Sequence, residues 1–289
     1  MVESKIAWAD LHVHGPIGLQ DYWLRKQGYY KQNIFQLIID QCNRKKLDIC
    51  AITSEAFHIE KGSVQDRFNF LIDKFPLPRG YQSGKLGENT FIVEADGRRV
   101  LFVNGQTVIV KEDGKRFDHL VVGSNQIPNE LGFDEVNKHC LDNGVISIGE
   151  HIFLGSHFGV GLERAIEYVQ NWDAIECNAQ LVLPRSLGWL PIIGQYSKES
   201  NDLVKIFAKT HDRPVVWNSD AHRIEDIGAA HISFDANELN FSDEDNFLQS
   251  FRELIRERKF HSQEGYVGIR DWINWTSKFF YGVYLDRKR

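Results

Sequence analysis

The sequence predicts an α/β barrel, and two observations support this fold class. Short apolar segments, typical of buried strands, alternate with helical patterns along most of the chain. The polar residues that could carry chemistry fall at or next to the ends of these strands. In barrels of parallel strands the functional site lies at the carboxyl ends of the strands, so the second observation supports the first independently.

Each expected element follows from a local pattern. Apolar runs predict strands at 6–9, 47–53, 145–149, 174–178 and 215–219. Helical spacing predicts helices at about 32–46, 68–75, 133–143, 162–171, 200–209 and 243–258. Asp96-Gly97 and Asp113-Gly114 predict two inserted hairpins, which pair 90–94 with 100–103 and 107–110 with 119–122. Residues 269–284 alternate apolar and polar positions.

Composition and charge bound the class of protein. The chain has 289 residues, of which 42% are hydrophobic, enough for a large core. A net charge of -6 argues against a general nucleic-acid binder, and no stretch of about 18 apolar residues predicts a membrane span. No signal-peptide pattern and no cysteine framework are present, so we expect a cytoplasmic protein. We expect one domain over 1–289, with its motifs at 6–235 and helices at 243–289 packing on or extending the barrel.

Two short motifs predict a metal site. His12 and His14 close the first strand, and alternation places both on one face about 7 Å apart along the strand. Asp220 and His222 follow the strand at 215–219 with the same spacing. A lone histidine is more often a structural residue than a ligand. Two such pairs, each at a strand end, instead favour convergence on one cation.

Further residues of ligand type are expected at the same rim. The strand at 47–53 is followed by Ser54, Glu55 and, a little later, His58. The strand at 145–149 is followed by Glu150 and His151, while Gln106 and His119 stand at the starts of the second hairpin's strands.

The order of these motifs resembles the PHP superfamily, named for polymerase and histidinol phosphatase, over about residues 6–235. The resemblance depends on Asp10-Leu11-His12-Val13-His14, Ala51-Ile52-Thr53, the Asn104-Gly105-Gln106 turn, His119-Leu120, Glu150-His151, Glu176-Cys177-Asn178 and Asn218-Ser219-Asp220-Ala221-His222. It implies a distorted (β/α)7 barrel that holds two or three metal ions and usually hydrolyses phosphoesters. It also implies metal ligands at His12, His14, His119, His151, Asp220 and His222.

The chain departs from the family pattern at three positions. Ser54-Glu55 stands where the family usually has Asp-His, and Gln106 stands where the family usually has a glutamate that bridges two metals. Two divalent ions about 3.7 Å apart repel each other by roughly 18 kcal/mol at an effective dielectric constant of about 20. A bridging carboxylate offsets part of that repulsion, whereas an amide brings no charge. We therefore expect a reduced site.

In that reduced site, His12, His14 and Asp220 form a three-ligand set with an open position, as in catalytic metal sites. His119 and His151 would hold a second ion weakly or orient the substrate. Glu55 with His222 would hold a third, with His58 as an alternative ligand. Gln106 would act as a neutral ligand or as a hydrogen-bond donor. The expected cofactors are one to three zinc, manganese or iron ions per chain.

The first functional hypothesis is a metal-dependent phosphoesterase that acts on a small phosphomonoester or phosphodiester, nucleotides included. Asp220 would be a ligand and proton acceptor, His222 or His151 the general acid, and Arg185 or Arg223 a phosphate clamp.

Two rival hypotheses stay open. One is a catalytically reduced binding or assembly module, motivated by Gln106 and Ser54-Glu55. The other is hydrolysis of an amide or lactone. A nucleic-acid substrate is less favoured, although Lys61, Arg67 and Lys74 could reach a phosphate backbone. The sequence predicts no oligomeric state.

Overall fold

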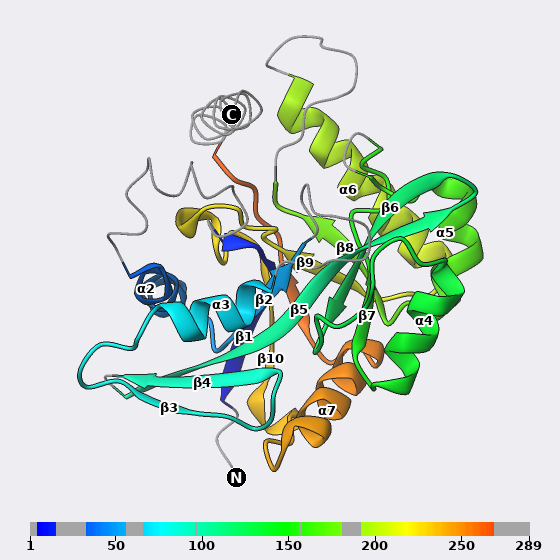
Figure 1. Cartoon of the computed structure of the whole chain (residues 1–289). Coiled ribbons are helices and arrows are strands. Elements are labelled where there is room, and N and C mark those ends of the chain that lie inside the picture. The colour runs from blue at the N-terminus through cyan, green and yellow to red at the C-terminus, as the bar shows by residue number, and fades with distance from the viewer. Residues whose placement is uncertain are drawn as a thin grey trace, which may run out of the picture.

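A mixed β-sheet winds into a nearly closed barrel in the computed structural model, which describes residues 5–15, 33–55, 66–95, 97–155, 158–180 and 192–268 (Figure 1). Its strands are β1 (Ile6–Val13), β2 (Ile49–Ser54), β3 (Gln82–Gly84), β4 (Thr90–Ala95), β5 (Arg98–Glu112), β6 (Lys115–Val122), β7 (Ile146–Gly149), β8 (Ala174–Asn178), β9 (Val215–Asn218), β10 (His231–Asp235) and β11 (His261–Gln263). The helices are α2 (Ile34–Lys45), α3 (Arg67–Lys74), α4 (Phe133–Asp142), α5 (Leu162–Tyr168), α6 (Ile192–Thr210) and α7 (Glu244–Arg256). Short 3-10 turns lie at Val169–Asn171, Ile224–Asp226 and Ala236–Glu238.

The strand order is β11-β10-β1-β2-β5-β6-β7-β8-β9. Strands β1, β2 and β5 are parallel, as are β7, β8 and β9, while β6 runs antiparallel to both of its neighbours. Helices between the strands cover the outside of the sheet (Figure 1). The predicted fold class, an α/β barrel, is confirmed, and the antiparallel β6 is the main distortion of its parallel pattern.

The barrel closes between β1 and the segment after β9. Val13 and Ala221 form an isolated parallel bridge, and the Ala221 N–H donates to the His12 carbonyl oxygen at 3.3 Å. The buried Asp10 carboxylate reinforces this seam. Its Oδ1 accepts from the Ser219 N–H at 3.1 Å, and its Oδ2 accepts from the Ser219 hydroxyl at 2.5 Å and the Gly228 N–H at 2.9 Å. The seam therefore brings the two predicted ligand motifs side by side.

Three apolar clusters stabilise the barrel. The first fills its interior with small and branched side chains such as Ala9, Ala51, Val103 and Ile148, and the apolar face of α7 packs into it. Leu248 of α7 lies against Gly123, so α7 covers the amino-terminal end of the barrel, below the strands in Figure 1. The second cluster packs α4, α5 and α6 on β5, β6, β8 and β9, and the third packs α2 and α3 on β1, β2 and β5.

The structure corrects several predicted elements. Asn104, Gly105 and Gln106 do not form a turn, because β5 runs through them without interruption and pairs with β2 and β6 on its two sides. β10 was not predicted, although Ile232 and Phe234 alternate with more exposed neighbours. Helix α6 begins earlier than expected, at Ile192. The predicted segment at 269–284 lies outside the described residues.

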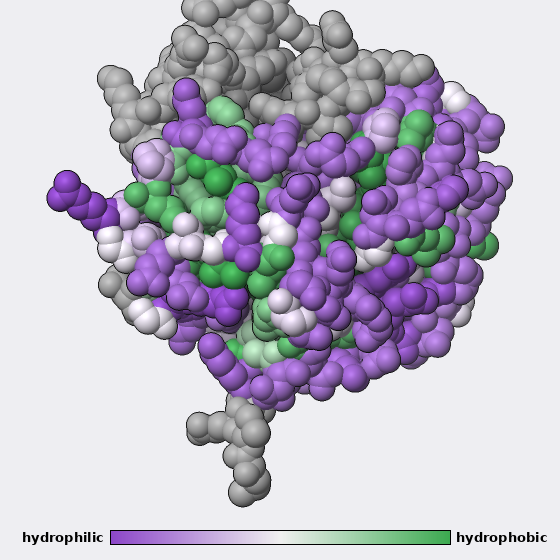
Figure 2. All heavy atoms as spheres, turned by 60° about the horizontal axis from the view of Figure 1, so that its bottom comes forward, coloured by the Kyte–Doolittle hydropathy of each residue, from purple (hydrophilic) through white to green (hydrophobic). Residues whose placement is uncertain are grey.

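The outer face at the amino-terminal end of the barrel is mostly hydrophilic, with separate hydrophobic patches (Figure 2). A shallow pocket there is lined by apolar residues that include Leu101, Leu239 and Phe241, with Lys5 and Arg99 beside them. Among the described helices, none is long and apolar enough to cross a membrane.

We expect Asp10→Ala to lower the free energy of unfolding by roughly 3 kcal/mol, because it leaves buried N–H groups of Ser219 and Gly228 without an acceptor. Urea unfolding of both proteins measures this change. Asp142→Ala is the matched control, since Asp142 is 58% exposed in an ion pair that contributes at most about 0.5 kcal/mol. Equal losses in the two variants would contradict the role assigned to Asp10.

Candidate metal centre

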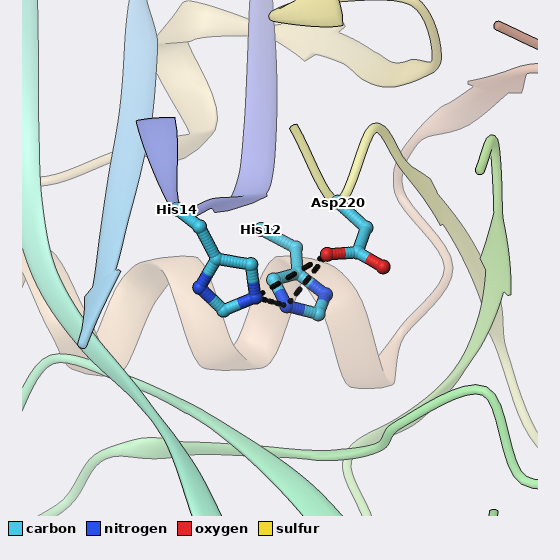
Figure 3. Close-up of side chains that lie close together, drawn as sticks. All are labelled: His12, His14 and Asp220. Carbon is cyan, nitrogen blue, oxygen red and sulfur yellow. Dashed lines mark hydrogen bonds and ion pairs between the residues drawn. The ribbon is translucent and has the colours of Figure 1, made fainter. Parts of the chain in front are cut away.

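His12, His14 and Asp220 converge at the mouth of the barrel, as Figure 3 shows. His12 and His14 come from the end of β1, and Asp220 from the turn after β9. The two Nε2 atoms lie 2.9 Å apart, and Asp220 Oδ1 lies 3.2 Å from His14 Nε2 and 3.6 Å from His12 Nε2. His222 Nδ1 also lies 3.4 Å from Asp220 Oδ1, which forms no hydrogen bond with the described residues.

The orientation of each imidazole is fixed by its other nitrogen. His12 Nδ1 lies 2.8 Å from Glu176 Oε1, and His14 Nδ1 lies 3.1 Å from the carbonyl oxygen of Thr53. Both oxygens are acceptors, so each Nδ1 carries a proton, and each Nε2 is the atom turned toward the other ring and Asp220. Glu176 is held in turn by the Asn218 amide, which donates to Oε1 at 2.9 Å.

This arrangement fits a cation. When Nε2 is deprotonated on both rings, the two facing lone pairs and the carboxylate oxygen repel each other unless a cation lies between them. Nitrogen and oxygen ligands at 2.0–2.1 Å in a tetrahedral zinc site stand about 3.3 Å apart, close to the separations seen here. The chemistry and spacing of the donors therefore suit a divalent transition metal.

A second cluster adjoins the first and consists of Asp118, Glu150 and His151. His151 Nε2 lies 3.2 Å from Glu150 Oε1 and 4.0 Å from Asp118 Oδ2. Glu150 Oε1 is also 3.5 Å from His12 Nε2, so one carboxylate stands between the two clusters. Glu150 Oε2 has no hydrogen-bond partner among the described residues, which leaves it available as a ligand.

Burial and crowding shift the pKa values of these groups. Burial and the nearby Glu150 carboxylate raise the pKa of Asp118 well above its usual range. Burial lowers the pKa of the His12 imidazole, but the charges of Glu176, Asp220 and Glu150 outweigh it, so the pKa rises well above 6.5. The site thus holds more negative charge than its histidines alone balance, which favours bound cations.

The turns that carry two of these residues are strained. Asp220 has a φ of +48° and His151 a φ of +24°, in the left-handed region that side chains other than glycine rarely adopt. Such conformations persist where the surroundings fix them, and they concentrate at functional sites.

A third cluster consists of His14, Glu55 and His222. His14 Nε2 lies 3.7 Å from Glu55 Oε2, and His222 Nδ1 lies 2.9 Å from the backbone oxygen of Asp220. Glu55 is also ion-paired to the buried Arg67. Burial raises the pKa of the Glu55 carboxyl, but the charge of Arg67 outweighs it, so that pKa falls to about 2. Arg67 therefore faces into the protein instead of toward a nucleic-acid backbone.

Two predicted ligands lie apart from these clusters. The Gln106 amide is bonded at both ends to the backbone of Ile127, donating to its oxygen at 2.7 Å and accepting from its N–H at 3.2 Å. The His119 ring packs on Phe133 outside the barrel, with Nε2 3.1 Å from the Ser147 hydroxyl. His119 belongs to none of the three clusters of histidine and carboxylate ligands found among the described residues.

The residues that sequence reasoning missed are Asp118, Glu150 and Glu176. Alternation along β6 carried the signal for Asp118, because Leu120 and Val122 point into the barrel and Asp118 shares their face. Glu150 and Glu176 stood inside the quoted motifs but were not assigned a role.

The proposed phosphate-binding arginines find no support among the described residues. Arg223 is ion-paired to Asp226, with Nε 2.7 Å from Oδ2. Arg185, Lys61 and the alternative ligand His58 lie outside the described part of the chain.

The fold and this cluster define a barrel with a candidate metal centre at its carboxyl-terminal mouth. A family model described as PHP-associated matches residues 198–254. The structure is similar to PsfC from Pseudomonas syringae (TM-score 0.58, 15% identity, covering 97% of this chain and 99% of that one).

It is also similar to a two-domain protein from Bacteroides vulgatus that contains a predicted PHP-like metal-dependent phosphoesterase (TM-score 0.54, 12% identity, covering 96% of this chain and 70% of that one). No curated protein sequence matches the chain significantly. The resemblance to the PHP superfamily is confirmed, in the fold of the whole barrel and in sequence over residues 198–254.

We expect Glu176→Gln to weaken metal binding by roughly 10- to 100-fold, because the amide no longer fixes the His12 tautomer with a charged acceptor. Isothermal titration calorimetry with zinc or manganese measures the affinity of each protein for the metal. The exposed Glu163→Gln is the matched control. Unchanged affinity in the Glu176 variant would argue against its role in orienting His12.

His119 gives a prediction about pH. Burial lowers the pKa of its imidazole from 6.5 to about 3, so the folded protein binds this proton less readily than the unfolded chain. The stability that the neutral ring contributes is present above pH 6.5 and is lost as the pH falls toward 3.

Between about pH 7 and about pH 5.5, the wild type should therefore lose about 1 kcal/mol more stability than His119→Gln. Urea unfolding at both pH values tests this difference. The variant should also retain its full metal content. Loss of metal would instead place His119 among the ligands.

Proposed function

We propose that the protein is a metal-dependent phosphoesterase that hydrolyses a small phosphomonoester or phosphodiester. The observation that carries the proposal is the convergence of His12, His14 and Asp220 next to the Asp118–Glu150–His151 cluster. The candidate cofactors are zinc, manganese or iron. His12, His14 and Asp220 would hold one ion, and Asp118, Glu150 and His151 would hold a second.

Divalent ions held there would supply Lewis acidity, polarising a phosphoryl oxygen and lowering the pKa of water toward neutrality. Glu150 supports a two-ion arrangement, because its carboxylate stands between His12 and His151. A reduced site is expected from the sequence because the amide of Gln106 carries no charge. Glu150 offers that negative charge from another strand.

His222 is the side chain best placed to move a proton to the leaving oxygen. It is more exposed than the other cluster histidines, with 24% of its side chain accessible, against 6% or less for His12, His14 and His151. Its Nδ1 faces the Asp220 backbone oxygen, so Nε2 is the atom that would deliver the proton. Asp220, whose Oδ1 faces the two histidines, would serve as ligand and proton acceptor.

A small substrate is favoured over a polymer. The chain has a net charge of -6, which repels a polyanion at long range. Arg67, predicted as a contact to a phosphate backbone, is fully buried and paired with Glu55.

Hydrolysis of p-nitrophenyl phosphate and a panel of nucleotides, with manganese, zinc or iron added, tests the proposal. We expect turnover with at least one metal, and a loss of more than about 100-fold in kcat/KM for His12→Ala/His14→Ala. Elemental analysis of the same samples should show metal in the wild type and little in the variant. Wild-type turnover no higher than that of the variant would contradict a hydrolytic function and favour a binding or assembly module.

The role of His222 predicts a dependence on the leaving group. For His222→Asn we expect kcat to fall by roughly 100-fold or more with an alkyl phosphate, whose leaving oxygen needs a proton, and much less with p-nitrophenyl phosphate. Steady-state kinetics with both substrates measure the ratio. An equal loss with the two substrates would instead assign His222 to binding.

A further inference from the structure

Arg67 occupies an unusual position for an arginine, since its side chain is fully buried beside the metal-ligand clusters. It is the first residue of α3, and its guanidinium is ion-paired to Glu55 Oε1. The other terminal nitrogen donates to the backbone oxygens of His14 and Thr53, at 3.4 and 3.3 Å. The guanidinium thus delivers a fixed positive charge at the edge of the His14–Glu55–His222 cluster.

The three clusters cannot all be filled with complete ligand sets. His14 belongs to two of them. Its Nδ1 faces the Thr53 oxygen, so Nε2 is the only ring nitrogen left for a metal, and one lone pair binds one ion. Asp220 Oδ1 is closer to His14 Nε2 than Glu55 Oε2 is, at 3.2 Å against 3.7 Å. An ion between His12, His14 and Asp220 therefore takes His14 from the third cluster.

What remains of the third cluster is His222 and a carboxylate that Arg67 already neutralises. Among the described residues, a divalent ion there would have two protein ligands and a guanidinium as neighbour, and like charges at such short range repel strongly in a buried site. The other two clusters differ in this respect. Among the described residues, no lysine or arginine is ion-paired to Asp220, Asp118 or Glu150.

We propose that the guanidinium of Arg67 takes the place of a third metal ion, so that the centre holds two ions per chain. The inference rests on the metal centre of the proposed function and sets its number of ions. It also leaves His222 without a metal, as its proposed role in proton transfer requires. In this arrangement Glu55 is a partner of Arg67 and not a metal ligand.

The number and position of ions in the wild type test the inference directly. We expect elemental analysis after manganese or zinc saturation to give two ions per chain. Anomalous diffraction from the same preparation should place them at the Asp220 and Glu150 clusters. A third anomalous peak next to Glu55 and His222 would overturn the inference and leave the phosphoesterase proposal standing. A protein that binds no metal would overturn both.

Variants at Arg67 provide a second test, with metal content and Tm as readouts. Arg67→Met keeps most of the side-chain volume but frees Glu55, so we expect a third ion at saturation and a larger rise in Tm on adding manganese than in the wild type. Arg67→Met/Glu55→Gln removes the released carboxylate and should return to two ions. Two ions in a folded Arg67→Met would overturn the inference; if that variant does not fold, the wild-type anomalous map decides.

Discussion

The junction between β1 and the segment after β9 determines where the candidate site forms. Residues 12 and 14 are separated from residue 220 by more than two hundred positions in the chain, and only closure of the barrel brings them together. Asp10 holds this junction from inside, accepting from Ser219 and Gly228 while lying two residues from His12. The first aspartate of the motif is therefore structural, and the proposed metal-binding role belongs to the two histidines.

Closure of the barrel also brings together the side chains that orient the candidate ligands by hydrogen bonds. Glu176 on β8 orients His12 on β1, and Asn218 on β9 holds Glu176. Asn178, at the end of β8, donates to Asp220 Oδ2 at 2.9 Å. His12 and Asp220 thus each have a partner from another strand, so these two candidate ligands are held in place by the barrel itself. The cost is a buried excess of negative charge, which bound cations offset.

The sequence predicted the part of the site that local rules control. Alternation on a strand and the position at a strand end were sufficient to bring His12, His14, Asp220 and His222 to one rim. The structure departs from the expected positions where the register of the sheet decides which way a side chain points. β6 is antiparallel, and the alternation of its side chains places Asp118 inside the barrel and His119 outside. β5 is continuous through Gln106, which turns that amide toward Ile127. A motif alone does not show which of these side chains point into the barrel, because that depends on how the strands pair.

The position of α7 determines from which end a small molecule can reach the candidate site. Its aromatic and aliphatic side chains, Phe247, Phe251 and Leu254 among them, pack into the interior cluster from the amino-terminal end. Side chains fill the interior between that helix and the metal-facing residues, so the barrel is not a channel. A molecule that reaches the mouth must depart through the same opening. For the proposed phosphoesterase, product that stays bound at the mouth would therefore block the next substrate.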